Sequence, residues 1–137
     1  MHTNEYIKRA LHMLEASPLK VTEQRIAMIN LLFKNGDKHF TAEDIYEEVC
    51  KRKIKISLAT IYNCLNQFKE CGIIKAIKIS SDKLYFDTNL KEHHHFFCLK
   101  SSKLIDVDTN KVKISKLPKL PKGKKLKSVE VIINITD

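Results

Sequence analysis

The sequence of 137 residues has only three glycines and three prolines, and it has no apolar run as long as a membrane span. The low glycine and proline content and the apolar fraction of 43% indicate a folded globular protein rather than a disordered one. The N-terminus also lacks the hydrophobic core of a signal peptide. We therefore expect a protein of the cytoplasm, with one ordinary domain or two small ones and no membrane partner.

Paired cysteine spacing, such as C-x-x-C, is absent from the sequence. Disulfide frameworks and thiolate zinc sites depend on such pairs. We therefore expect free thiols, mostly buried, in a reducing compartment. The four cysteines are Cys50, Cys64, Cys71 and Cys98.

Acidic residues are in the minority, because 25 Lys and Arg face 16 Asp and Glu and give a formal net charge of +9. Such an excess favours an acidic partner, with nucleic acid first. Solvated lysines are the alternative, because lysine is abundant here and arginine is scarce. Charge alone does not distinguish DNA binding from a solvated surface, so the order of the predicted helices and strands is needed to choose between them.

The first half of the sequence predicts helices with clear start and stop signals. A first helix over residues 5–16 ends before Pro18, which cannot continue it. Thr22 can cap a second helix, and Asn35 with Gly36 supplies a left-handed stop.

Two further helices follow in the same half. Thr41 can cap a third helix, with Asp44 completing a capping box. Ser57 can cap a fourth helix, which runs to Cys71 and stops at Gly72. Several apolar residues in these two helices are spaced to face inward: Ile45, Val49, Ile61, Leu65 and Phe68.

A β-hairpin is predicted after the fourth helix, with strands over 73–79 and 84–86 and a turn over 80–82. Short helices followed by a small hairpin predict a winged helix-turn-helix, whose fourth helix would enter the major groove of DNA. Each candidate residue taken alone could simply lie on an ordinary exposed helix face. The prediction of DNA binding therefore depends on the combination of the fold, the positive charge and the uncharged polar face of this helix. The candidate DNA-binding residues are Lys55, Ser57, Thr60, Tyr62, Asn63 and Asn66.

These candidates would have different roles. The asparagines can pair bidentately with adenine, and Tyr62 can reach a thymine methyl group or a phosphate. Thr60 and Lys55 can hold phosphates near the start of the helix.

A second hairpin is predicted in the other half, with strands over 93–98 and 103–107 and a turn over 99–102. This loop length places His95 opposite Asp106, with their Cβ atoms about 5 Å apart. The pairing brings an imidazole and a carboxylate together.

Three consecutive histidines lie in the first of these strands. Because side chains alternate along a strand, His93 and His95 share one face and His94 points to the other. Imidazole together with Asp106 suits a divalent transition metal. A solvated, tag-like histidine tract is the alternative, but this tract is internal and precedes two phenylalanines.

The last part of the sequence is rich in lysine and contains Pro118 and Pro121. These prolines allow at most a short helix over 109–117. A strand over 129–135 is expected to be central in the sheet and partly at a dimer interface. The lysines over 111–127 are interpreted first as a solvated rim and second as contacts to the DNA backbone.

Three segments resemble the signature segments of the ferric uptake regulator family: VTEQR at 21–25, HFTAEDIY at 39–46 and SLATIY at 57–62. The resemblance covers nearly the whole chain in order. Within the family, further segments are most similar to the iron response regulator (Irr) subgroup: 62–68, 85–89, the triple histidine and 117–123.

The resemblance implies an α+β protein with a winged helix-turn-helix over 1–87 and a small α/β dimerisation and metal-sensing domain with a three-stranded sheet over 88–137. It implies a homodimeric repressor of iron homeostasis that binds A/T-rich, palindromic double-stranded DNA and is not an enzyme. It also implies a set of ligands for iron, zinc or manganese: His39, Asp87, His93, His95 and Asp106.

Haem is a further expectation, because the subgroup resemblance implies haem sensing through His93, His94 and His95. The four-thiolate zinc of many relatives is not expected, since Ser101 takes the place of a thiolate and no cysteine follows Cys98. Alternatives to iron sensing are a zinc-, manganese- or peroxide-sensing regulator. A metalloenzyme is a distant alternative, because it needs an open coordination position and a general base.

Overall fold

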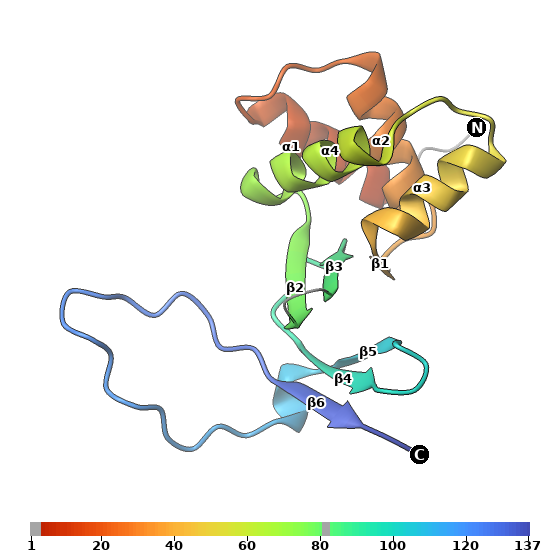
Figure 1. Ribbon diagram of the computed structural model, residues 1–137. Coiled ribbons are helices and arrows are strands. Elements are labelled where there is room, and N and C mark those ends of the chain that lie inside the picture. The colour runs from red at the N-terminus through yellow and green to blue at the C-terminus, as the bar shows by residue number, and fades with distance from the viewer. Residues whose placement is uncertain (1–3, 81–82) are drawn as a thin grey trace. The chain divides into compact units, whose positions relative to one another are not determined.

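The computed structural model describes residues 4–80 and 83–137. The chain forms two compact units, Met1–Leu90 and Lys91–Asp137 (Figure 1). Among the described helices, none has the length and apolar content that crossing a membrane requires.

The described part of the first unit contains four α-helices: α1 (Glu5–Ala16), α2 (Glu23–Phe33), α3 (Ala42–Lys51) and α4 (Leu58–Glu70). Each begins after a side chain that accepts a backbone N–H of the first turn, and these N-caps are Asn4, Thr22, Thr41 and Ser57. Thr41 and Asp44 form the predicted capping box. Such a cap typically contributes about 1 kcal/mol, because it satisfies a donor that has no partner inside the helix.

The core of the first unit is formed by the inward faces of these helices. The predicted stripe of α4 is confirmed, because Ile61, Leu65 and Phe68 are completely buried. Gly36 has a φ of +75°, so the predicted left-handed stop after α2 is confirmed. α4 ends before Gly72, as predicted, and Gly72 is also left-handed, with a φ of +77°.

The predicted hairpin forms from β2 (Lys75–Ser80) and β3 (Lys83–Asp87). β2 begins two residues later than predicted, because Ile73 and Ile74 are buried in the core. The N–H of Ile73 donates to the carbonyl of Phe68 and closes a Schellman motif at the end of α4. The expected turn includes residues 81–82, which lie outside the described part.

A third strand in this sheet was not predicted. β1 (His39–Phe40) pairs antiparallel with β3, and the strand order within the described residues is β1-β3-β2. The register places His39 opposite Asp87 and Phe40 opposite Phe86. The loop before α3 is thereby fixed against the end of the hairpin.

The second unit contains, in its described residues, a three-stranded sheet of order β5-β4-β6. β4 (His94–Cys98) pairs antiparallel with β5 (Leu104–Val107), in the predicted register of His95 opposite Asp106. β6 (Ile132–Ile135) pairs parallel with β4 on the other side. The expectation that the last strand is central was wrong, because β4 has partners on both sides and β6 lies at an edge.

A long segment connects β5 and β6. It begins with the 3-10 turn η1 (Thr109–Lys111), and residues 112–131 then contain no helix or strand. The expectation of at most a short helix here is confirmed. Figure 1 shows this segment as a loop that extends away from the small sheet.

Candidate metal centre and DNA-reading helix

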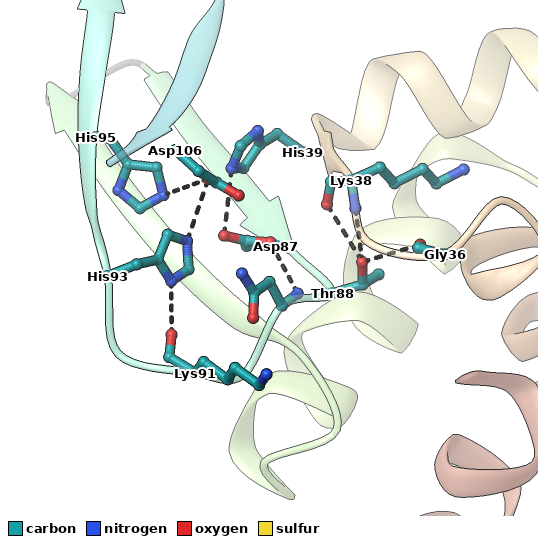
Figure 2. A network of polar contacts seen from close by, with 10 residues as sticks. Gly36, Lys38, His39, Asp87, Thr88, Lys91, His93, His95 and Asp106 are labelled. Atoms are coloured by element: carbon teal, nitrogen blue, oxygen red, sulfur yellow. Dashed lines mark hydrogen bonds and ion pairs between the residues drawn. The ribbon is translucent and has the colours of Figure 1, made fainter. Parts of the chain in front are cut away.

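The first unit brings together His39 and Asp87, which face each other across β1 and β3. His39 Nε2 lies 3.3 Å from Asp87 Oδ2, and the Asp87 side chain is 1% exposed (Figure 2). The other carboxylate oxygen of Asp87 accepts the backbone N–H of Asn89 at 2.8 Å. A carboxylate buried to this degree requires such partners, because burial without them is very costly.

Thr88 fixes the backbone that carries His39. Its hydroxyl accepts the N–H of Lys38 at 2.8 Å, and its own N–H donates to the Lys38 carbonyl at 3.2 Å (Figure 2). Thr88 is completely buried. It thus extends the pairing of β1 with β3 by one residue. This role could not be recognised from the sequence, because a single threonine after a strand is not distinctive.

The second unit brings together His93, His95 and Asp106, as predicted. The Nε2 atoms of His93 and His95 lie 3.2 Å and 3.4 Å from the same oxygen, Asp106 Oδ1 (Figure 2). The two imidazole ring centroids are 4.4 Å apart. Both histidines are almost fully buried, whereas the Asp106 side chain is 42% exposed.

The hydrogen bonding of His93 defines which of its nitrogens carries a proton. Nδ1 lies 2.5 Å from the carbonyl oxygen of Lys91, and a carbonyl can only accept, so Nδ1 is the donor. In the neutral ring, Nε2 then presents a lone pair toward the Asp106 carboxylate. Two acceptors face each other in this way only with a proton or a cation between them. Histidines that bind a metal through one ring nitrogen typically donate the N–H of the other to a carbonyl or carboxylate, as His93 does here.

Within each unit, the distances between candidate ligand atoms are those expected for atoms that bind the same metal ion. Charge-assisted hydrogen bonds between nitrogen and oxygen are about 2.7–2.9 Å long, whereas the three histidine–carboxylate distances are 3.2–3.4 Å. Ligands about 2.0–2.2 Å from a tetrahedral metal lie about 3.4 Å apart. The chemistry and spacing of both groups therefore suit a divalent transition metal.

His94 has a hydrogen-bond partner of its own. Its Nδ1 accepts the backbone N–H of Val131 at 2.9 Å. In the neutral ring the proton is then on Nε2, so ligation of haem through Nε2 would require the other tautomer and the loss of this hydrogen bond. The contact of His94 is structural: it joins the histidine strand to the residue before β6.

Helix α4, which the sequence predicts to enter the major groove, presents its candidate residues in different environments. Asn63 and Lys55 are exposed, whereas Thr60, Tyr62 and Asn66 are half-buried. The Ser57 hydroxyl accepts the N–H of Thr60 at 3.1 Å and lies 2.8 Å from the Thr60 hydroxyl. The observed role of Ser57 is therefore to cap α4, rather than to present a free hydroxyl.

Tyr62 has a partner that sequence reasoning missed. Its hydroxyl donates to the carboxylate of Glu43, which lies in the first turn of α3. This hydrogen bond raises the pKa of Tyr62, because the negative carboxylate disfavours loss of the phenol proton. The contact connects the two helices of the helix-turn-helix and holds the tyrosine ring in place.

All four cysteines lie in the described part of the chain and are free, as predicted. The expectation that most are buried was wrong, because only Cys64 is buried and Cys50 is exposed. Burial raises the pKa of the Cys64 thiol to about 11. Cys50 is exposed because it lies outside the inward stripe of α3, which Ile45 and Val49 form.

Comparison with known proteins identifies related sequences. The profile of the ferric uptake regulator family matches residues 16–134. The ferric uptake regulation protein of Haemophilus ducreyi is 37% identical over 97 residues, which cover 69% of this chain and 65% of that protein. The peroxide-responsive repressor PerR of Staphylococcus epidermidis is 33% identical over 100 residues, which cover 73% of this chain and 66% of that protein. The matches thus span just under two thirds of these relatives.

Solved structures show the same fold. The ferric uptake regulator from Pseudomonas aeruginosa with manganese has a TM-score of 0.72 at 20% identity, over 93% of this chain and 97% of that one. The Helicobacter pylori regulator, described as having three functional metal binding sites, has a TM-score of 0.69 at 21% identity, over 99% and 92%. These similarities confirm the predicted α+β fold class, whereas the Irr subgroup stays a prediction.

Proposed function

Because the chain belongs to the ferric uptake regulator family, we propose that it is a metal-responsive, DNA-binding repressor of iron homeostasis that acts in the cytoplasm as a homodimer. It acts by binding rather than by catalysis. The observation that carries the metal response is the geometry of His93, whose Nδ1–H is fixed by Lys91 while its Nε2 faces Asp106.

The proposed metal site takes ligands from both units. His39 and Asp87 would supply two ligands, and His93, His95 and Asp106 would supply three. Neither group alone provides the four protein ligands of a closed structural site. Five residues lie between Asp87 and His93 in the sequence, and six residue-to-residue steps span at most about 20 Å. The chain itself therefore keeps the two groups within reach of one another.

Binding of a shared ion would restrict the two units to arrangements in which all five side chains reach it. The ion supplies positive charge, which offsets the two carboxylates. A ligand shifts a conformational equilibrium only by its difference in affinity for the two states. Here the difference arises because arrangements that separate the two ligand groups lose two or three of the five ligands. Metal availability would thereby set the fraction of protein able to place two reading helices on a palindromic operator.

Iron, zinc and manganese all accept imidazole and carboxylate ligands. Iron is the leading candidate because the relatives include ferric uptake regulation proteins. Peroxide sensing is the second candidate, supported by the similarity to PerR. Zinc has no redox chemistry, so a loss of DNA binding after peroxide treatment of the iron-loaded but not the zinc-loaded protein would favour this second function.

The experiment that tests the proposal compares His95→Ala with His12→Ala, a matched control at an exposed position of α1. DNA for the assay is selected from random sequence with the wild-type protein. His95→Ala removes a proposed ligand and should lower metal affinity by about 100-fold or more, because loss of a residue that only hydrogen-bonds to a ligand already costs about 10–100-fold. The variant should abolish metal-dependent DNA binding. His12→Ala should change neither. Unaltered metal response in His95→Ala would contradict the proposal.

A second variant tests whether one ion is shared. His39→Ala removes a ligand of the first unit only. With a shared ion, this variant should weaken the same metal-binding event that His95→Ala weakens, at one ion per chain in calorimetry. Two independent events in the wild-type protein, each abolished by only one variant, would show separate ions.

A further inference from the structure

The positive charge of this protein is concentrated in one segment. Residues 109–129 contain eight lysines and no acidic residue, whereas the other 116 residues contain 17 basic and 16 acidic side chains. The segment therefore accounts for nearly all of the net charge of +9. Residues 1–90 contain 14 basic and 11 acidic side chains, so the first unit supplies a smaller share of the net charge that attracts DNA than the segment does.

The lysines of this segment are available for binding. All eight are exposed, and in the described part of the chain none of them forms an ion pair. Three lysines of the first unit differ in this respect, since Lys8, Lys34 and Lys51 are each paired with a glutamate. The charge of the segment is therefore not neutralised within the chain.

A short repeat in the sequence favours an extended, regular backbone in part of the segment. Residues 116–122 read Lys-Leu-Pro-Lys-Leu-Pro-Lys. Proline fixes its own φ and restricts the residue before it to extended conformations. A polyproline II helix has three residues per turn and rises about 3.1 Å per residue. Lys116, Lys119 and Lys122 would thus lie along one edge, about 9 Å apart.

We propose that residues 111–127 form a basic arm that binds the phosphate backbone of duplex DNA without sequence preference, while α4 reads the bases. This inference rests on the proposed DNA-binding function. A line of unpaired lysines complements a linear polyanion, and the restricted backbone loses little conformational entropy on binding. The prolines prevent the amphipathic helix on which membrane-surface binding usually depends, so DNA is favoured over an anionic lipid surface.

The test is a salt titration of the full-length protein with Lys116, Lys119 and Lys122 all replaced by glutamine. Each lost phosphate contact lowers the slope of log affinity against log salt by about 0.9. The triple variant should therefore lose about 2–3 from this slope. The decrease in affinity between about 50 and 200 mM salt should be about 40-fold smaller than for the wild type. The selected and a scrambled duplex should be affected equally.

Two further variants are matched controls. The triple Lys→Arg variant keeps the charge and should keep the wild-type slope. Pro118→Ala with Pro121→Ala keeps the charge but loosens the spacing, and should cause a smaller loss than the glutamine variant. Helix content and thermal unfolding should be unchanged in every variant, because the substituted residues are exposed.

Several outcomes would contradict the proposal of a DNA-binding arm. An unchanged salt slope in the glutamine variant would show that these lysines do not contact phosphate. If the variant instead loses binding to phosphatidylserine vesicles, the segment is a membrane-surface element. If it becomes monomeric in ultracentrifugation, the segment is an assembly element. A wild-type protein that binds no duplex at all would refute the proposed function itself.

Discussion

The two units of this protein differ in what holds them together. The largest fully buried side chains of the described residues all belong to the first unit, and they include Phe33, Phe68 and Phe86. In the second unit the buried apolar side chains are Phe97 and Val107, and the three histidines are buried beside them. The first unit can be stabilised by apolar burial alone, whereas a small sheet with polar side chains in its interior needs ligands or partners.

The largest expected effect tests the apolar core of the first unit. Phe68→Ala should lower the free energy of unfolding by about 3–5 kcal/mol, because it removes a completely buried ring and leaves a cavity. Phe97→Ala in the second unit should cause a smaller decrease in the free energy of unfolding that the helical signal reports. Urea unfolding followed by circular dichroism measures both. Equal losses would show that the two units unfold as one cooperative body.

The second prediction concerns the buried thiol of the first unit. Burial raises the pKa of Cys64 from an ordinary value of 9.0 to about 11. A group whose folded-state pKa is raised contributes stability at low pH and loses it as pH rises. The protein should therefore lose about 3 kcal/mol between about pH 9 and pH 11, at 1.36 kcal/mol per pKa unit.

Two cysteine variants check this assignment. Cys64→Ala should flatten the alkaline loss of stability, and Cys98→Ala, which changes a half-buried thiol of the second unit, should leave it as in the wild type. The exposure of the thiols also predicts their alkylation rates: exposed Cys50 should react first and buried Cys64 last. An alkaline transition that persists in Cys64→Ala must have another origin.

The third prediction is the smallest and concerns metal removal. A metal held at 100 times its dissociation constant stabilises the folded state by about 2.7 kcal/mol. Chelation should reduce hydrogen-exchange protection in β4 and β5 by up to this amount, while the core of α2 and α4 changes little. Equal changes in both units would mean that metal supports the whole chain rather than the small sheet.

Local signals in the sequence were sufficient for most of the first unit. Thr22, Thr41 and Ser57 cap helices because their side chains act within three residues of their own position, and such contacts can be recognised from spacing alone. The hairpin register that faces His95 with Asp106 was also predictable, because the loop length fixes it. The second-unit ligand group follows directly from that register.

Contacts between distant residues could not be predicted in this way. The short strand β1, the hydrogen bonds of Thr88 to Lys38, and the contact of Tyr62 with Glu43 each join residues that are far apart in the sequence. The edge position of β6 was missed for a related reason, since nothing in its composition shows which neighbour it pairs with. The positions of His39 and Asp87 as ligands came only from the family resemblance.

The parallel pairing of β6 with β4 has a practical consequence. β6 covers one backbone edge of the strand that carries the histidines, and the N–H of Leu99 donates to the carbonyl of Ile135 at its far end. Proteolytic clipping before Ile132 would expose that edge. Open strand edges promote pairing between molecules. A clipped preparation would therefore tend to aggregate through β4 while its helices stay folded.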